Sequence, residues 1–520
     1  MSKLFNIAGP CIPAEHYMLP TTQRCKGVME LIDRKEYFVI HAARQTGKTT
    51  LLFDLLNQLE ETGNYYSLYC SLETAHQFSE PSEGIRTVVG TLNLELKRHL
   101  SLKKFRPEEE INFADYGNVL HGFLSELCLN ADKPIVIFFD EIDCLSQGTL
   151  ISFLRQLRSG FISRSRYPFL HSVALVGMRN VRDFKGYIRD DSDTLGSASP
   201  FNIITTSKQI RNFNKKEVSE LLNQHTESTG QNFPTDVSSK IYDRTNGQPW
   251  LVNAIAREIT MNILSNDASK SISPEHTNQA VETIIRRRDT HIDSLLERLK
   301  EKRVQKIIEP MILGDSVASD DLDDDFGYVK DLGLIEDVDG SIRPANSIYG
   351  EVILRVLSSS AYNSMCEENH PVGSSAYESD GKLDMVGILS DFQQFWRENS
   401  EIWVERYQYK EAAPHLVLQA FLNKIINGGG QVRREVASGT GRLDLCVYFK
   451  DTRYAIELKI YRGQKSLEKG KKQLLNYLDN LGLSEGYLVL FDPDKKKSWQ
   501  EKLYHRTESV ADHMIHIFGA

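Results

Sequence analysis

The stretch YFVIHAARQTGKTTLLFDLL, residues 37–56, decides the fold of the first part of the chain. Its apolar run over 37–42 predicts a buried strand, and the apolar periodicity after Thr50 predicts a helix. The turn between them, Ala42 to Thr49, fits G-x-x-x-x-G-K-[ST] except that alanine replaces the first glycine. Strand, glycine loop and helix in this order predict an α/β fold with a parallel sheet and a phosphate-binding loop.

The residue types of this loop suit a nucleoside triphosphate. Backbone N–H groups and the following helix N-terminus can cradle phosphates, Lys48 can reach the β- and γ-phosphates, and the Thr49 hydroxyl can coordinate Mg²⁺. Ala42 makes the turn tighter to build but removes no ligand. The residues expected to bind the cofactor are Ala42, Ala43, Arg44, Gln45, Thr46, Gly47, Lys48, Thr49 and Thr50.

An acidic motif follows a second apolar run. Residues 135–139, IVIFF, read as a strand that is buried on both faces. This strand delivers Asp140 and Glu141 at its carboxyl end, where open α/β sheets bind ligands. We expect Asp140 to bind Mg²⁺ together with Thr49, and Glu141 to act as general base for the attacking water. Asp143 is expected to cap or pair locally.

A further strand over 171–180 is expected to carry a γ-phosphate sensor. It ends at Arg179 and Asn180, and either side chain can fill this role. We assign the cofactor contact to Arg179. Four arginines could reach a neighbouring subunit, although most are expected to be solvated: Arg155, Arg158, Arg164 and Arg166.

The pattern becomes helical after residue 212. The segment TNGQPWLVNAIAREI, residues 245–259, opens a helix with Pro249 in its first turn. Residues 303–357 then predict helix, helix, hairpin and helix in succession. The second of these helices, over 323–335, is acidic and therefore poor at contacting nucleic-acid phosphates. An intramolecular or protein contact is the favoured role for it.

The order of glycine loop, Asp-Glu strand end, sensor strand and helical G-x-P region resembles AAA-like and STAND-type P-loop ATPases. The resemblance implies ATP hydrolysis with Mg²⁺ and a lid that closes over nucleotide through Pro249. The helix–helix–hairpin–helix order resembles a winged-helix domain, which often follows such a lid. We expect a homo-oligomer.

A second informative stretch runs from Arg442 to Tyr477. RLDLCVYF and YAIELKI predict the two strands of a hairpin. Because side chains alternate along a strand, Glu457 and Lys459 share one face, and Asp444 can join them across the ladder. Carboxylate oxygens suit Mg²⁺ or Mn²⁺, which can lower the pKa of a bound water beside a phosphodiester. Lys459 could orient that water.

Asp444, Glu457-Leu458-Lys459 and the downstream Gln473 and Tyr477 resemble the PD-(D/E)XK nucleases and their RecB-like branch. The resemblance implies that Gln473 and Tyr477, one helical turn apart, help to hold the metal site and the nucleic-acid backbone. It also implies an earlier acid from the domain's first helix. Glu411 is the candidate for that acid and Glu435 the runner-up. The strand GYLVLFD, residues 486–492, is expected to be the last of the α/β core.

The net charge is −9, so the chain as a whole is not basic. We therefore expect any nucleic-acid contact to be confined to a local basic surface. No apolar run approaches the ~20 residues of a membrane helix. Scattered cysteines without C-x-x-C pairs favour the cytoplasm and argue against disulfides and structural zinc. A basic face beside the carboxylates is expected from Arg433, Arg434, Arg442, Arg462, Lys465, Lys469, Lys471 and Lys472.

These patterns divide the chain into five predicted parts. They are an ATPase core (1–212), a helical lid (213–289), a winged-helix-like domain (290–357), a Ser-rich linker (358–382) and a nuclease domain (383–520). Nearly the whole chain resembles bacterial ATP-binding proteins that join an AAA-like ATPase to a PD-(D/E)XK domain. Some fusions of this design serve in defence against foreign DNA.

We therefore expect an ATP-hydrolysing module that controls a metal-dependent nuclease acting on DNA, with RNA less favoured. Two alternatives remain open. The C-terminal fold could hold nucleic acid without cutting it, or the ATPase could be a slow switch in a nucleotide-gated assembly, which Ala42 leaves possible.

Overall fold

The computed structural model describes residues 3–107, 115–179, 200–287, 289–312, 323–338, 340–353, 377–406, 413–426, 430–433, 445–494 and 496–520. The chain divides into two compact units. The first comprises Met1–Asp293, Asp320–Glu336 and Pro344–Ile348, and the second Ser294–Ser319, Asp337–Arg343 and Tyr349–Ala520. None of the helices within the described ranges is long and apolar enough to cross a bilayer.

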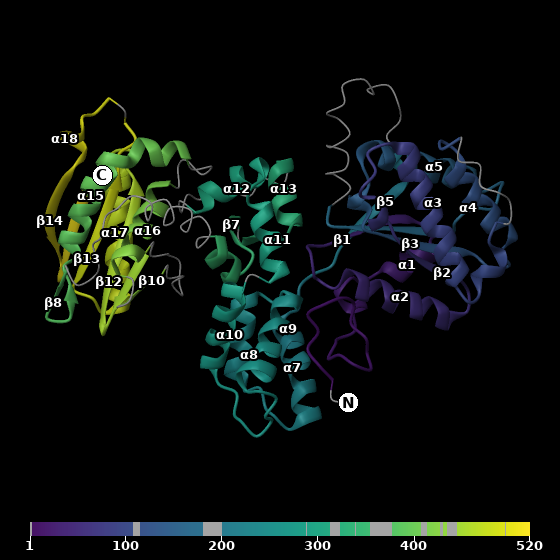
Figure 1. The fold of residues 1–520 in the computed structure, drawn as a ribbon, viewed down its shortest axis with the longest axis horizontal. Helices are drawn as coiled ribbons and strands as arrows, with labels where there is room; N and C mark the ends of the chain where they lie inside the picture. The colour runs from purple at the N-terminus through teal and green to yellow at the C-terminus, as the bar shows by residue number, and fades with distance from the viewer. Residues whose placement is uncertain are drawn as a thin grey trace. The chain divides into compact units, whose positions relative to one another are not determined.

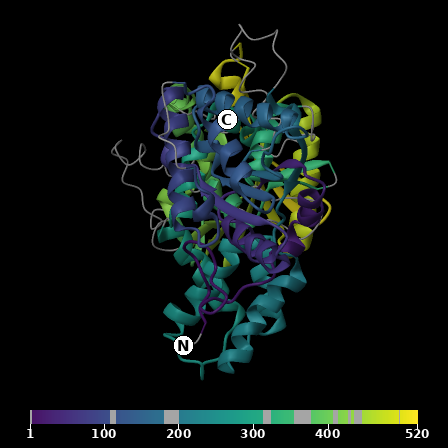
Figure 2. The ribbon, with the colours of Figure 1, turned by 90° about the vertical axis from the view of Figure 1, so that its right-hand side faces the viewer.

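A five-stranded parallel sheet forms the centre of the first unit (Figures 1 and 2). Its strand order is β2–β3–β4–β1–β5, so β4 lies between β1, which precedes the glycine loop, and β3, which ends at Asp140. The carboxyl ends of these three strands therefore meet at one edge of the sheet. The strands are β1 (Tyr37–His41), β2 (Tyr66–Ser71), β3 (Ile135–Asp140), β4 (Ser172–Gly177) and β5 (Ile204–Gln209).

Helices cover both faces of this sheet, as the apolar strands predict. Side chains alternate between the faces: Val39 and Ile137 pack with α3, α4 and α5, whereas Phe38 and Phe138 pack with α1 and α2. The helices are α1 (Val28–Asp33), α2 (Lys48–Thr62), α3 (Pro81–Arg98), α4 (Val119–Asn130) and α5 (Gln147–Ser163).

The helical region predicted after residue 212 is present. Asn214 and Glu217 form a capping box at its first helix, and a π-helix over Glu258–Ile263 extends α9. The helices are α7 (Lys215–Thr229), α8 (Thr235–Thr245), α9 (Pro249–Arg257) and α10 (Pro274–Arg287).

The predicted order of helix, helix, hairpin and helix follows. The elements are α11 (Thr290–Arg298), α12 (Lys302–Ile312), α13 (Asp324–Asp331), β6 (Ile335–Val338), β7 (Ser341–Pro344) and a helix over 347–353. The acidic helix is shorter than the predicted 323–335. It ends at Asp331 because Gly333, with φ +72°, adopts the left-handed conformation that stops a helix.

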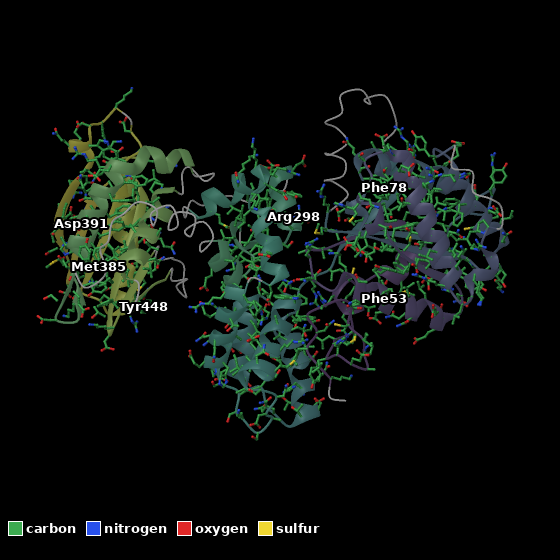
Figure 3. The ribbon with its side chains drawn as sticks, viewed as in Figure 1. Phe53, Phe78, Arg298, Met385, Asp391 and Tyr448 are labelled. Atoms are coloured by element: carbon green, nitrogen blue, oxygen red, sulfur yellow. The ribbon has the colours of Figure 1, made fainter. Side chains whose placement is uncertain are left out.

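A six-stranded mixed sheet forms the core of the second unit, in the order β10–β11–β12–β13–β15–β14. Helices α15 and α16 pack on one face and α17 on the other. Met385 at the start of α15 and Tyr448 on β11 are labelled in Figure 3. The helices are α15 (Met385–Arg406), α16 (Ala413–Ile426), α17 (Gln464–Leu481) and α18 (Trp499–Lys502). The strands are β10 (Gly430–Arg433), β11 (Leu445–Phe449), β12 (Thr452–Ile460), β13 (Glu485–Phe491), β14 (Tyr504–Val510) and β15 (His513–Gly519).

One sequence prediction needs correction in this unit. GYLVLFD, which forms β13, is not the last strand, because β15 pairs with it in parallel and β14 then closes the edge. The polar, exposed β14 gave no apolar signal. At the end of the predicted linker, Glu378–Ser379 (β8) and Lys382–Leu383 (β9) form a small hairpin. Residues 358–376 of the predicted linker lie outside the described ranges.

Candidate nucleotide site and C-terminal carboxylate site

The glycine loop makes its left-handed turns at Gln45, with φ +57°, and at Gly47, with φ +91°. Ala42 is buried and is not among the residues with positive φ. The position where the motif usually has glycine therefore does not need the left-handed conformation here. This explains in physical terms how alanine is accommodated at the start of the loop.

Lys48 is buried at the start of α2. Its Nζ donates to the carbonyl oxygens of Ala42 at 3.0 Å and of Ala43 at 3.1 Å. Burial lowers the pKa of the Lys48 ammonium, and the nearby carboxylates of Glu141 and Asp140 oppose that shift. A phosphate group would supply the charge partner that the loop carbonyls now replace.

Thr49 and Asp140 lie together as the sequence predicts. The Thr49 hydroxyl donates to Asp140 Oδ2 at 3.1 Å, and the Tyr69 hydroxyl donates to the same oxygen at 3.1 Å. Asp140 is buried at the carboxyl end of β3. A hydroxyl and a carboxylate side by side fit Mg²⁺, which prefers hard oxygen ligands. Tyr69 was not predicted, and its place on β2 gave no sequence signal.

Glu141 adopts an unusual backbone conformation, with φ +58° and ψ +42°. Such left-handed non-glycine residues concentrate at functional sites, where the surrounding structure holds the strain. Burial, and secondarily the Asp140 charge, raise the pKa of Glu141. A carboxylate with a raised pKa at this edge of the sheet suits the predicted general base.

Asp143 connects the end of β3 to the end of β4 through side-chain contacts. It accepts a short hydrogen bond from the backbone N–H of Met178, and its Oδ1 lies 3.8 Å from Arg179 Nε. The local pairing expected for Asp143 is therefore present. Gly177 makes the approach possible, because a Cβ there would stand 2.3 Å from Asp143 Oδ2. Asn180, the alternative sensor, lies outside the described residues.

The G-Q-P segment begins α9 beside the glycine loop. A Cβ on Gly247 would stand 1.8 Å from the carbonyl oxygen of Phe213, so glycine is required at this position. The Gln248 side chain caps α9 by accepting from Leu251 N–H at 2.6 Å, and its amide nitrogen lies 3.5 Å from the carbonyl oxygen of Gln45. Pro249 is the buried first residue of this helix.

The acidic helix α13 contacts the edge of the parallel sheet at which the phosphate loop lies. Asp331 Oδ1 lies 3.5 Å from Nε2 of His41 at the end of β1. The Arg179 guanidinium lies 5.5 Å from the centre of the Tyr328 ring. These contacts agree with the intramolecular role favoured for this helix. The partners themselves could not be predicted, because they lie far apart in the sequence.

Of the four arginines that could reach a neighbouring subunit, Arg164 has well-defined contacts within its own unit. Arg164 stacks on the Phe161 ring, 3.9 Å from its centre, and donates to the carbonyl oxygen of His171 at 3.4 Å. His171 directly precedes β4, at the opposite edge of the sheet from the glycine loop. Arg164 is therefore held locally.

In the second unit, Glu457 and Lys459 share the face of β12 that packs against α17. Glu457 is fully buried, and its Oε1 lies 2.7 Å from Lys459 Nζ. Cys446 and Tyr448 belong to the same side of the sheet, whereas Ile456 and the other alternate residues face α15 and α16. This alternation agrees with the prediction. Asp444 lies outside the described residues, as do Glu411 and Glu435.

Gln473 and Tyr477 both lie on α17, which packs over this face of the sheet. Tyr477 is buried. Gln473 Oε1 is buried and has no hydrogen-bond partner among the residues that the structure describes. Within the same residues, no group of three or more His, Cys, Asp or Glu side chains is placed to hold a metal. This statement does not cover the predicted acids Asp444 and Glu411, because both lie outside the described residues.

Four lysines of the predicted basic face lie on α17. Lys471 is not available to a phosphate, because its Nζ lies 2.6 Å from Glu508 and 3.6 Å from Glu468. Lys465, Lys469 and Lys472 are exposed along α17. Arg434 and Arg442 lie outside the described residues, as does the side chain of Arg433.

The parallel sheet, the glycine loop with Lys48 and Thr49, and the adjacent Asp140 and Glu141 define a P-loop ATPase. A family model for the AAA-like domain matches residues 17–351. The chain therefore belongs to the AAA-like domain family.

Three solved structures illustrate the similarity. A Walker-type ATPase of Pyrococcus abyssi is 13% identical, with a TM-score of 0.46 over 67% of this chain and 99% of that one. The RuvB Holliday junction branch migration motor of Thermotoga maritima is 12% identical, with a TM-score of 0.31 over 63% and 91%. Cdc6p from Pyrobaculum aerophilum is 12% identical, with a TM-score of 0.34 over 62% and 88%. No curated protein matches the chain.

Proposed function

We propose that this ATPase controls a divalent-metal-dependent nuclease built on the six-stranded sheet of the second unit. The observation that carries the proposal is the pair formed by Glu457 and Lys459. Their charged atoms lie 2.7 Å apart, and the carboxylate is fully buried between β12 and α17. DNA is the favoured substrate, as a phosphodiester that a bound metal could polarise.

A structural salt bridge is the competing explanation for this pair. Taking a carboxylate out of water costs several kcal/mol, and apolar residues of similar volume are often equally or more stable at such positions. Leu488 and Leu490 on β13 show that this layer of the core accepts apolar side chains. A buried glutamate paired with a partly exposed lysine among them is therefore better explained by chemistry than by stability.

A metal site beside Glu457 requires a second carboxylate. Leu445 pairs with Ile456 in the antiparallel ladder of β11 and β12. Asp444, which precedes Leu445 in the chain and lies outside the described residues, is proposed as the second carboxylate. Asp444 and Glu457 would then hold Mg²⁺ or Mn²⁺, which makes a bound water more acidic. Lys459 would orient that water, and Gln473 would supply a buried amide oxygen beside it.

The contacts of α13 support control by nucleotide. Tyr328 and Asp331 touch Arg179 and His41, two residues at the ends of strands that border the phosphate loop. A γ-phosphate would compete with the Tyr328 ring for the Arg179 guanidinium. The position of α13 can therefore depend on whether ATP or ADP is bound, and α13 precedes the second unit's main segment in the chain.

The test is cleavage of labelled single- and double-stranded DNA by the full chain with Mg²⁺ or Mn²⁺, with and without ATP. Wild type is compared with Asp444→Ala, Glu457→Gln and Lys48→Ala. We expect metal-dependent cutting that both carboxylate variants abolish while ATP turnover persists. Lys48→Ala is expected to abolish the effect of ATP on cutting.

Glu508→Gln is the matched control, because it removes a carboxylate paired with a lysine on the same domain at 2.6 Å. It should cut like wild type. DNA binding without cutting under all conditions would favour the alternative in which the C-terminal fold only holds nucleic acid. Equal ATP turnover in wild type, Lys48→Ala and Glu141→Gln would contradict the hydrolysis on which the control depends.

A further inference from the structure

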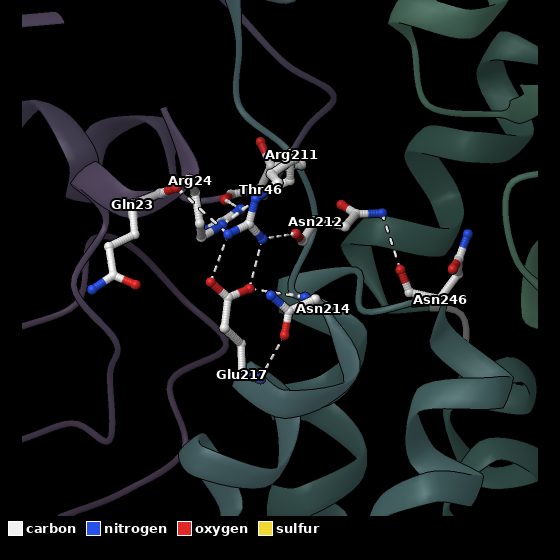
Figure 4. Close-up of polar contacts among 8 residues, drawn as sticks. All are labelled: Gln23, Arg24, Thr46, Arg211, Asn212, Asn214, Glu217 and Asn246. Atoms are coloured by element: carbon white, nitrogen blue, oxygen red, sulfur yellow. Dashed lines mark hydrogen bonds and ion pairs between the residues drawn. The ribbon is translucent and has the colours of Figure 1, made fainter. Parts of the chain in front are cut away.

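Arg24 is a buried arginine behind the phosphate loop, at the end of a short 3₁₀ helix over Thr22–Arg24. Its Nη2 donates to the carbonyl oxygen of Thr46 at 2.7 Å, and its Nε donates to the carbonyl oxygen of Arg211 at 2.9 Å (Figure 4). The guanidinium also stacks on the Phe213 ring, 4.6 Å from its centre. Burial lowers the pKa of Arg24 to about 10, so the side chain keeps its charge at neutral pH.

The hydrogen bond from Arg24 to the Thr46 carbonyl fixes the orientation of the Thr46–Gly47 peptide, whose N–H faces the phosphate site. The carbonyl of Thr46 and the N–H of Gly47 belong to one planar trans peptide, so they point in opposite directions. Holding the carbonyl toward Arg24 therefore turns the Gly47 N–H toward the other side of the loop. That side is where successive N–H groups of such a loop bind phosphate oxygens.

Gly47 makes this constraint necessary. Its φ of +91° lies in the left-handed region, where glycine moves easily between conformations. A rotation of the Thr46–Gly47 peptide would replace a phosphate donor by a carbonyl oxygen, which repels phosphate. A Cβ on Gly47 would stand 3.5 Å from Arg24 Nη1, so the guanidinium packs directly behind this peptide.

The other contacts of Arg24 fix its own position. Its partner Arg211 lies between β5 and α7 and forms two bonds to Glu217, at 2.6 and 2.7 Å. Glu217 in turn accepts from the backbone N–H of Asn214 at 2.8 Å, within the capping box that begins α7 (Figure 4). The guanidinium of Arg24 thus links the phosphate loop to the segment between β5 and α7.

We infer that Arg24 is a positioning residue for nucleotide binding, which holds the Thr46–Gly47 peptide in the orientation that presents the Gly47 N–H to the phosphates. It touches neither the reacting atoms nor, by this geometry, the nucleotide. Its loss should weaken the binding of the phosphate chain more than it slows the chemical step.

The experiment measures KM and kcat for ATP, and the Kd of ADP, in Arg24→Ala and Arg24→Lys of the full chain. A hydrogen bond from a charged group predicts a rise of about ten- to a hundredfold in KM and in the Kd of ADP for Arg24→Ala. The value of kcat at saturating ATP should stay close to wild type. Arg24→Lys should fall between, because an ammonium cannot reproduce the two-carbonyl fork. Millimolar guanidinium should partly restore KM in Arg24→Ala.

Arg287→Ala is the control for a merely structural effect. Arg287 bonds to Glu258 and Asp289 in the same unit, and neither of these partners belongs to the phosphate loop. Its loss should lower Tm without changing KM. Wild-type KM and ADP affinity in both Arg24 variants, with only Tm lowered, would overturn the inference. If Arg24→Ala does not fold, an unchanged KM in Arg24→Lys overturns it.

Discussion

At the scale of single residues, Ala42 tests how much the phosphate loop depends on its first position. Its φ is not positive, so glycine is not required there. Ala42→Gly should therefore leave KM for ATP within about twofold of wild type. It should destabilise the first unit by about 1–2 kcal/mol, because a buried methyl is lost and the unfolded chain gains freedom.

Urea unfolding and steady-state ATP turnover check both parts of this prediction. If the ATPase is a slow nucleotide switch, a different rate of ATP turnover is expected for Ala42→Gly. If alanine restrains the loop, Ala42→Gly should speed turnover several-fold, and this result would contradict our account of the loop.

Glu141 sets the acid limit of ATP turnover if it is the general base. A base must be deprotonated to act, and burial raises its pKa above the usual 4.5. As pH falls through this raised value, the carboxylate gains a proton and kcat/KM declines. We expect the acid limb of the pH profile above pH 4.5.

The nearby carboxylate of Glu73 offers a second test of Glu141 as the general base. The carboxylate of Glu73 also raises the pKa of Glu141. Glu73→Gln should therefore move the acid limb to lower pH, without removing a residue of the site. An acid limb at or below pH 4.5 in the wild type would show that another group governs the profile.

At the scale of elements, sequence patterns predict buried strands and miss exposed ones. β1, β3 and β4 are apolar runs because helices cover both of their faces. β5 (ITTSKQ) and β14 (YHRTESV) lie at sheet edges with many exposed side chains, so their sequences resemble loops. Exposure of β14 explains only part of the error in the predicted last strand, because β15 was also missed although five of its seven residues are buried.

The candidate site shows the same limit. Lys48, Thr49, Asp140 and Glu141 stand within local motifs, and each motif fixes its own backbone. Arg24 reaches Arg211 across 187 positions of the chain. No periodicity reports such a pair, so only the folded structure brings it to the phosphate loop.

Helix α13 yields a prediction about nucleotide response. If Arg179 contacts the γ-phosphate, as proposed, the phosphate competes with the Tyr328 ring for its guanidinium. Hydrogen exchange of the α13 amides should then be faster with a non-hydrolysable ATP analogue than with ADP. Tyr328→Leu keeps an apolar side chain but removes the ring. This variant should exchange faster with ADP and lose the difference between nucleotides. Equal protection with both nucleotides in wild type would contradict a role for α13 in sensing.

At the scale of the whole molecule, the two compact units allow ATP binding and its transmission to be measured separately. A multi-domain chain need not unfold in one step. ATP at a hundred times its Kd should stabilise the first unit by about 2.7 kcal/mol. Trp250→Phe leaves the remaining tryptophans, Trp396, Trp403 and Trp499, in the second unit, so fluorescence then reports that unit's unfolding.

Under the proposed control of the nuclease, ATP must also change the second unit's unfolding midpoint, since a ligand can influence a distant site only through a coupling free energy. Typical couplings of about 1–3 kcal/mol would be visible in the denaturant midpoint. Lys48→Ala should abolish the shift, and Glu457→Gln should preserve it. In the Trp250→Phe chain, ATP could stabilise the first unit and leave the second unit's unfolding midpoint unchanged. This result would mean that no coupling free energy links ATP binding to the second unit. The two activities would then share a chain without one governing the other.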